Sequence, residues 1–353
     1  MPHSACPYTV VLIVPTGIGA RMGGYAGDAL PLAKALAASC DQLITHPNVM
    51  NGAQMYWPLP NALYVEGYAL DQFAAGAWGL QPVVQNRVGL VFDQSIEPEL
   101  LQRHLQAADA ARATLGLSLT DYILTDEPLG VELKTSDSGA SWGTIARPDS
   151  LLRATEKLIQ QQRAEAIAVV ARFPDDPGAT VLQDYRHGIG VDPLAGAEAV
   201  ISHLIVRQFQ IPCAHAPALP PLAVDPEISP RSAAEELGYT FLPCVLVGLS
   251  RAPQFTTNHK EQSGSILTSN VDAVIIPASA CGGSGLLKWA AGSAKIITVA
   301  ENHTQMSVYP EDLGITVIPA SSYLEAIGIV TVDRAGMSLD SFSAQVQPLQ
   351  KLV

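Results

Sequence analysis

The sequence predicts an α/β fold, with mostly parallel, open, Rossmann-like sheets that are covered by helices. Short apolar runs recur along the chain without strict polar alternation, as in strands that are buried on both faces of a parallel sheet. Helical patterns separate these runs, and this alternation is typical of α/β proteins. A glycine-rich loop joins the first run to the first helix, which places backbone N–H groups at a strand end.

The elements follow in order. A strand is predicted at 10–14, and an Ala- and Leu-rich helix at 29–40 follows the glycine loop. Further strands are predicted where apolar runs of five or six residues are flanked by polar or turn-forming residues: 87–92, 166–171, 244–249, 273–277, 295–299 and 314–318. Helices are predicted where apolar residues recur at helical spacing: 97–115, 150–164, 196–209 and 232–238.

Proline- and glycine-rich segments suggest where the chain divides. The segment 212–222 holds four prolines and predicts neither a helix nor a central strand. The polar segments 134–141 and 251–265 predict surface loops. We therefore expect two α/β lobes, residues 1–145 with the glycine loop and residues 146–353, and a single continuous domain is the alternative.

The composition excludes some classes of function. The 353 residues are 48% hydrophobic and only 15% charged, which suits a large core or a homo-oligomer. The net charge of −13 and the lack of a Lys/Arg cluster exclude a nucleic-acid role. No window approaches the ~20 apolar residues of a membrane span, so we expect no membrane partner.

The cysteines predict the compartment. Five cysteines lie far apart, without a CxxC pair, so neither a disulfide framework nor a zinc knuckle is expected. The N-terminal residues lack the basic and apolar regions of a signal peptide. These observations predict a reducing, cytoplasmic location.

The first glycine loop is a candidate anion site. It is neither a dinucleotide fingerprint, because Met22 stands at the third glycine position, nor a P-loop, because no Gly-Lys-Ser/Thr occurs. Its backbone could cradle a phosphate or carboxylate, and the residues that would do so are Thr16, Gly17, Gly19, Gly23 and Gly24. The alternative is that the glycines serve tight turns and close packing.

A second cluster follows the run at 42–44. His46, Asn48 and Asn51 come at its end, and Glu66 lies between two tyrosines after the next run. His46 and Glu66 are candidate acid/base groups, and the two asparagines are candidate ligand contacts. Turn formation by Pro, Asn and Gly is the alternative explanation.

Other candidates follow later strands. Arg172 and Arg186 are potential anion-binding groups. The strand–glycine–helix pattern recurs at Ser279, Gly282, Gly283 and Ser284, and Glu301 with Asn302 forms a further polar strand end, with Glu301 as a third candidate acid/base group.

Three further residues have structural explanations that we favour over functional ones. Cys213 and His215 lie two apart in an extended segment, and Cys213 is expected to pack as a small hydrophobe while His215 reaches the crevice. His203 is expected to be a buried, hydrogen-bonded histidine.

Long motifs in the chain resemble the DUF3326 family, a domain of unknown function in cyanobacteria, plants and some archaea. The matching segments include VPTGIGARMGGYAGDALPLAKAL, LITHPNVMNGAQMYWPLPNALYVEGYALDQF, GVDPLAGAEAVISHLIV and DAVIIPASACGGSG. The resemblance extends from about residue 8 to 330. It implies a photosynthetic source and supplies no reaction, cofactor or catalytic residue.

These observations favour an enzyme that acts on a small anionic metabolite, phosphorylated or carboxylated, between the glycine loops. A non-catalytic binding or regulatory protein and a structural subunit are the alternatives. An enzyme should bring at least two titratable side chains within hydrogen-bond reach of one point. The sequence predicts no particular cofactor or metal.

Overall fold

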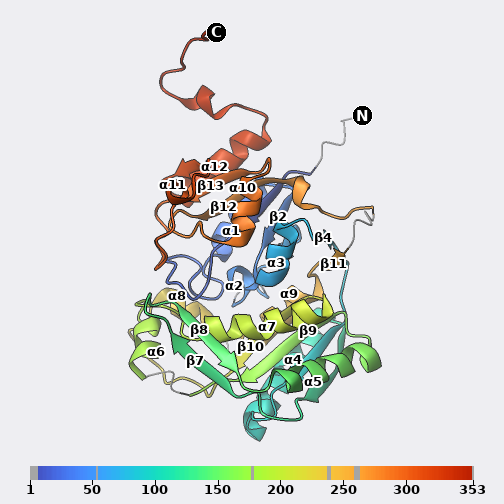
Figure 1. Cartoon of the computed structure of the whole chain (residues 1–353). Helices are drawn as coiled ribbons and strands as arrows, with labels where there is room; N and C mark the ends of the chain where they lie inside the picture. The colour runs from blue at the N-terminus through green and yellow to red at the C-terminus, as the bar shows by residue number, and fades with distance from the viewer. Residues whose placement is uncertain (1–6, 53–54, 176–178, 237–239, 258–262, 352–353) are drawn as a thin grey trace.

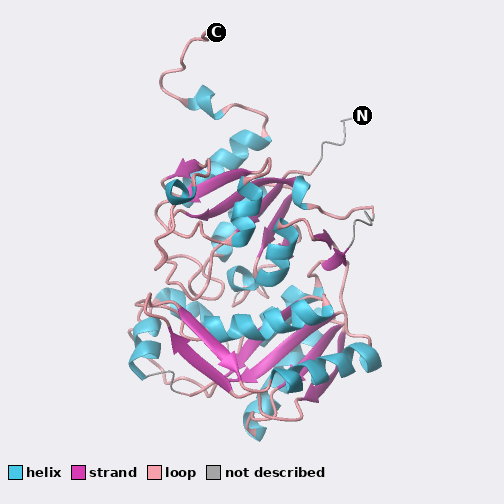
Figure 2. Cartoon of the chain, viewed as in Figure 1, coloured by secondary structure: helices cyan, strands magenta, loops and turns pink. Residues whose placement is uncertain are grey.

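The computed structural model describes residues 7–52, 55–175, 179–236, 240–257 and 263–351 and has two lobes, each built on a parallel sheet (Figures 1 and 2). The larger sheet has six strands in the order β14-β13-β12-β1-β2-β3. Its strands are β1 (Thr9–Leu12), β2 (Gln42–Thr45), β3 (Ala62–Tyr64), β12 (Val271–Pro277), β13 (Lys295–Val299) and β14 (Ile318–Ala320). The strand order places β1 beside β12, although they are far apart in sequence.

The second sheet has four parallel strands in the order β10-β9-β5-β6. They are β5 (Val88–Phe92), β6 (Leu119–Leu124), β9 (Ala166–Arg172) and β10 (Cys213–Ala218). The strand β10, which contains Pro217, lies at the edge of the sheet, where a missing N–H is tolerated. The prediction of an α/β fold with helix-covered parallel sheets is confirmed.

Helices cover both faces of the six-stranded sheet. The side chains of Val10 and Leu12 face α1 (Leu30–Ser39) and α12 (Tyr323–Arg334), whereas Val11 faces α3 (Gly67–Ala74) and α10 (Ser284–Ala290). Because successive side chains of a strand point to opposite faces, burial on both faces requires the continuous apolar run that the sequence shows.

The four-stranded sheet is covered in the same way. Helices α4 (Pro98–Leu115) and α9 (Leu242–Ser250) lie on one face, and α5 (Pro148–Gln162) and α7 (Ala195–Phe209) lie on the other. An antiparallel hairpin of β7 (Val131–Thr135) and β8 (Ser141–Ile145) packs against α7. The shorter helices are α2 (Pro47–Met50), α6 (Ala179–Arg186), α8 (Pro230–Glu235) and α11 (Pro310–Leu313), with 3-10 turns at Thr268–Asn270 and Leu339–Phe342.

Three local predictions are wrong. The run 244–249 lies in the helix α9 and not in a strand, because α9 is buried on nearly all sides and its apolar residues therefore show no helical period. The strand β11 (Gln254–Thr257) lies within the predicted loop 251–265, whereas the loop predicted at 134–141 is present as the turn of the hairpin β7–β8 at residues 136–140. The last strand begins at Ile318, where the run predicted at 314–318 ends.

The chain passes between the lobes twice. It leaves the six-stranded lobe after β4 (Trp78–Gln81) and returns at β11, and these two strands pair antiparallel with each other. Between them, buried Asn86 donates hydrogen bonds to the carbonyls of Leu249 and Ala252, both at 2.8 Å. A division near residue 145 falls directly after β8 and does not separate the sheets, because the six-stranded sheet takes strands from both ends of the chain.

Among the described helices, none combines the length and the apolar character that crossing a membrane would require.

Candidate functional site

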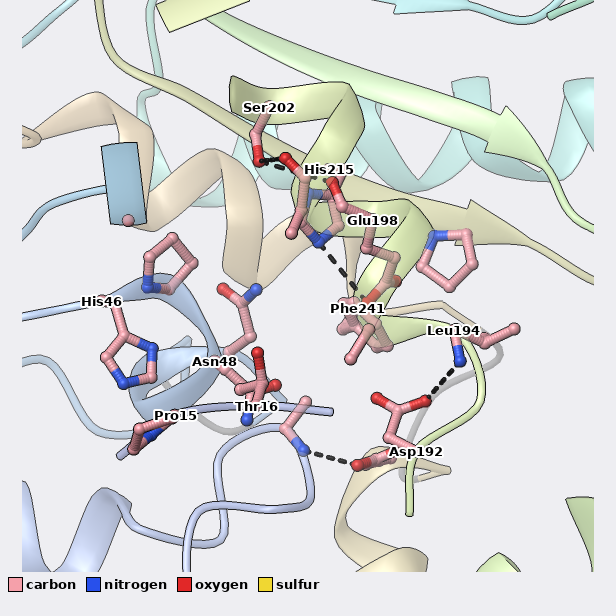
Figure 3. A pocket seen from close by; sticks show the side chains of 18 of the residues that line it. Pro15, Thr16, His46, Asn48, Asp192, Leu194, Glu198, Ser202, His215 and Phe241 are labelled. Carbon is pink, nitrogen blue, oxygen red and sulfur yellow. Dashed lines mark hydrogen bonds and ion pairs between the residues drawn. The ribbon is translucent and has the colours of Figure 1, made fainter. Parts of the chain in front are cut away.

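A cavity of about 720 Å³ lies between the two lobes (Figure 3). On one side it is lined by residues that follow the carboxyl ends of β1, β2, β3 and β12, at a single edge of the six-stranded sheet. On the other side it is lined by α7, by β10 and by the segments that precede and follow them. Ligands of open α/β sheets bind at this kind of edge, so the cavity is the candidate functional site.

His46 is fixed in the wall of the six-stranded lobe. It directly follows β2 and occupies the N-cap position of α2, which Pro47 begins. Its Nε2 atom accepts a hydrogen bond from the Val14 N–H at 3.0 Å, and burial lowers the pKa of the ring to about 4. His46 is therefore neutral at pH 7, and its remaining proton lies on Nδ1.

Glu66 and His203 connect the two lobes across the cavity. Glu66 caps α3, where one carboxylate oxygen accepts the N–H groups of Tyr68 and Ala69. Its other oxygen is 2.8 Å from Nε2 of His203, on α7 of the opposite lobe. Burial is the largest single effect and opposes protonation of His203. The hydrogen bond to Glu66 and the negative charges of Glu66 and Asp71 together outweigh it, so the pKa of the imidazole is raised.

A second carboxylate–histidine pair lies one turn away on the same helix. Glu198 of α7 approaches Nε2 of His215, on β10, at 3.5 Å (Figure 3). The Nδ1 atom of His215 is buried without a hydrogen-bond partner in the described part of the chain. Two Glu–His pairs thus contribute to the lining of one cavity.

Two further carboxylates stand near Glu198. Asp192 accepts the backbone N–H of Leu194 at 2.8 Å, and Glu235 accepts the hydroxyl of Tyr185, also at 2.8 Å. Burial, and then the negative charge of Glu198, raise the pKa of Asp192 to about 7. Burial and the charge of Asp192 likewise raise the pKa of Glu235 well above its usual range.

Positive charge is scarce in the cavity. Arg186 is the one lysine or arginine among the described lining residues, and it is bound in two places by Glu236, at 2.9 and 3.1 Å. The lining carries six carboxylates, from Glu66, Asp71, Asp192, Glu198, Glu235 and Glu236. The site is therefore acidic, and this charge does not favour the anionic ligand that the sequence predicts.

The first glycine loop links the lobes, and many of its N–H groups have partners within the protein. The N–H of Met22 bonds to Asn302, that of Gly23 to Asp28, and that of Ala26 to Glu235. The ring of Tyr25 stacks on Tyr185 with 4.5 Å between centroids.

Two of the loop glycines are required for packing. At Gly23, where φ is +83°, a Cβ would lie 2.4 Å from the Val14 side chain, and at Gly24 it would lie 2.3 Å from the Ala20 carbonyl. The loop geometry thus supports the packing alternative over an anion cradle.

The structure brings some of the predicted site residues together and separates others. Those that line the cavity are Thr16, His46, Asn48, Asn51, Glu66, Arg186 and Gly283. Those outside its lining are Gly17, Gly19, Gly23, Gly24, Arg172, Ser279, Gly282, Ser284, Glu301 and Asn302. The two glycine loops nevertheless share this edge, since Thr16 and Ala26 from the first and Gly283 and Gly285 from the second reach the same cavity.

The residues outside the lining have structural partners. The carboxylate of Glu301 accepts the N–H of Tyr323 at the start of α12, and Asn302 binds both backbone groups of Met22. Arg172 is held by Glu97 and Asp175. Each of these side chains is engaged in stabilising a loop or a helix end.

Sequence reasoning did not select the acidic residues of the second lobe. Asp192, Glu198, Glu235 and Glu236 lie in loops or on helix faces where a carboxylate is ordinarily solvated, and only the packing of the lobes encloses them. The presence of Glu198 and His203 on one predicted helix could have pointed to this carboxylate and imidazole as site residues. Cys213 is 1% exposed and burial raises the pKa of its thiol, while its neighbour His215 lines the cavity.

Comparisons with known proteins place the chain in a family. The family model described as a protein of unknown function (DUF3326) matches residues 9–343. The chain is also 64% identical, over 329 residues, to an uncharacterized lipoprotein of a Synechococcus strain, covering 93% of this chain and 91% of the relative. The chain therefore belongs to the DUF3326 family.

The name of this relative overturns one expectation. The sparse cysteines and the N-terminal sequence predict a cytoplasmic protein, but a relative that matches nearly the whole chain is named a lipoprotein. The predicted cytoplasmic location is therefore wrong. A small number of widely spaced cysteines argues only against disulfide bonds and carries no information about a lipid anchor.

Proposed function

We propose that the cavity between the lobes binds a small organic molecule and that the protein is an enzyme that performs acid/base chemistry on it. The observation that carries the proposal is the pair of Glu–His couples, Glu66–His203 and Glu198–His215, which face one cavity from two lobes. The cavity volume of about 720 Å³ is within the range of small-molecule sites.

The two couples differ in ways that suit opposite roles. Glu66 stabilises the protonated form of His203, so this imidazole is suited to donate a proton. His215 is more enclosed than His203, with 16% of its side chain exposed against 45%. Its unpartnered Nδ1 is suited to exchange a proton with a bound molecule. A neutral His46 supplies a fixed donor on the opposite wall.

Turnover of cell metabolites tests this function. The wild-type protein is incubated with a small-molecule extract of Synechococcus cells, and the extract is profiled by mass spectrometry. A double variant, His203→Gln with His215→Gln, removes both imidazoles while keeping amide hydrogen bonds. His303→Gln, an exposed histidine outside the cavity lining, is the matched control.

We expect one compound to be consumed by the wild type and by His303→Gln, and left intact by the double variant. Loss of a general acid or base commonly lowers the rate by about 10²–10⁴-fold. A compound that is retained in native mass spectra but never converted would indicate a non-catalytic binding protein. If no compound is retained and none is converted, the proposal is refuted.

A further inference from the structure

The charge of the cavity identifies the class of ligand, on the assumption that the proposed site binds a small molecule. We infer that the ligand carries an ammonium or guanidinium group, which lies between Asp192, Glu198 and Glu235, and an apolar body. This inference replaces the anionic ligand that the glycine loops suggest.

Within the described residues, two carboxylates of the cavity lack a positively charged partner. Glu236 is neutralised by Arg186, and Glu66 and Glu198 each have a histidine partner. The described contacts of Asp192 and Glu235 are backbone N–H groups and the Tyr185 hydroxyl, none of which is positively charged. A buried carboxylate without a cation is costly unless it takes up a proton or a positive ligand.

Two side chains of the lining carry buried polar atoms without partners in the part of the chain that the structure describes. Trp289 lines it, is 3% exposed, and has an indole N–H without a hydrogen-bond partner among the described residues. The buried Nδ1 of His215 is a second such atom. Because buried polar groups are nearly always satisfied, unpartnered ones in side chains beside a cavity are what a bound molecule that repacks the lining would satisfy.

The lining also offers apolar surface to a ligand. The cavity wall includes Leu182, Leu194, Leu219 and Phe241, which present this surface. A ligand body of carbon atoms would bury against these side chains, while its cationic group meets the carboxylates. A metal ion is a poorer fit, since the described residues contain no cluster of three or more ligating side chains with suitable geometry.

Three probes of similar shape and different charge test the inference: benzylamine, benzyl alcohol and benzoate. Their affinities are measured by ligand-observed NMR near pH 8, above the pKa of about 7 to which burial raises the Asp192 carboxyl group. The variants are Asp192→Asn alone and combined with Glu235→Gln, both of which retain hydrogen-bond acceptors. Asp109→Asn, at an exposed position on α4, is the control.

We expect benzylamine to bind the wild type and Asp109→Asn at least roughly tenfold more tightly than benzyl alcohol, the scale of one charge-assisted hydrogen bond. The double variant should abolish this preference, and Asp192→Asn should reduce it. Tighter binding of benzoate, or benzylamine affinity that the double variant leaves unchanged, would overturn the inference while leaving the site intact. If no probe binds, the proposed function itself fails.

Discussion

At the scale of the residue, Asp192 shows that a buried carboxylate in a cavity can lower the stability of the folded protein. Its folded-state pKa of about 7 lies above the usual value for an aspartate, so ionisation disfavours the folded protein. Groups with shifted pKa values are frequent at functional sites, because the free energy of ligand binding offsets the repulsion between like charges that the site holds close together.

The pH dependence of stability tests this account of Asp192. The folded protein favours the protonated carboxyl group. The stability that Asp192 contributes is therefore fully present below about pH 4, the pKa of an aspartate in the unfolded chain, and is lost as the pH rises through about 7, its pKa in the folded protein. We expect Asp192→Asn to raise the melting temperature near pH 8 and to change it little near pH 4. Calorimetry of the variant and the wild type at both pH values gives the difference. An equal shift at both would show that ionisation is not the cause.

At the scale of the element, α7 is the helix that assembles the site. It carries Glu198 and His203, and its first turn packs against the hairpin β7–β8. Gly196 permits this contact, because a Cβ there would lie 2.2 Å from the Cα of Trp142. The position of both Glu–His couples therefore depends on a residue that has no chemistry of its own.

Two glycine substitutions in helices should have opposite effects. Gly196→Ala forces α7 away from the hairpin, and we expect a loss of about 1–3 kcal/mol in the free energy of unfolding, as for overpacked cores. Gly328→Ala, in α12, meets no atom within 4 Å and should stabilise by about 0.5–1 kcal/mol through helix propensity. Urea denaturation of both variants measures the two values. A Gly196→Ala protein as stable as the wild type would contradict the close packing.

At the scale of the whole molecule, the two lobes are interleaved along the chain. Residues 88–250 build the four-stranded lobe as one continuous insertion, and the six-stranded sheet is completed only when the C-terminal strands pair beside β1. The cavity exists because the insertion returns α7 and β10 to face the edge of the first sheet.

Fragments of the chain distinguish this topology from a division near residue 145. We expect residues 1–145 alone to remain unfolded, because β1 lacks β12 and β5 lacks β9. Residues 86–253 contain a complete four-stranded sheet with all of its helices and should fold. Circular dichroism and NMR dispersion of both fragments provide the measurement, and cooperative unfolding of the 1–145 fragment would overturn the expectation.

The sequence by itself determined the fold class, the strands β1, β5, β9, β12 and β13, the long helices α1, α4, α5 and α7, and the edge of the sheet where His46, Asn48 and Glu66 meet. These features depend on local apolar patterning and on the rule that parallel strands end at one edge. The helical state of α9 was not visible, since a segment buried on all sides has no period.

Only the tertiary structure decided what lies opposite that edge. Asp192, Glu198 and Glu235 come from a loop and two helices of the other lobe, and no spacing in the sequence relates them to His46 or Glu66. The acidic character of the cavity follows from long-range packing that encloses carboxylates which would otherwise be solvated. Local sequence patterns record which side chains a strand buries, but not which lobe will be folded over its end.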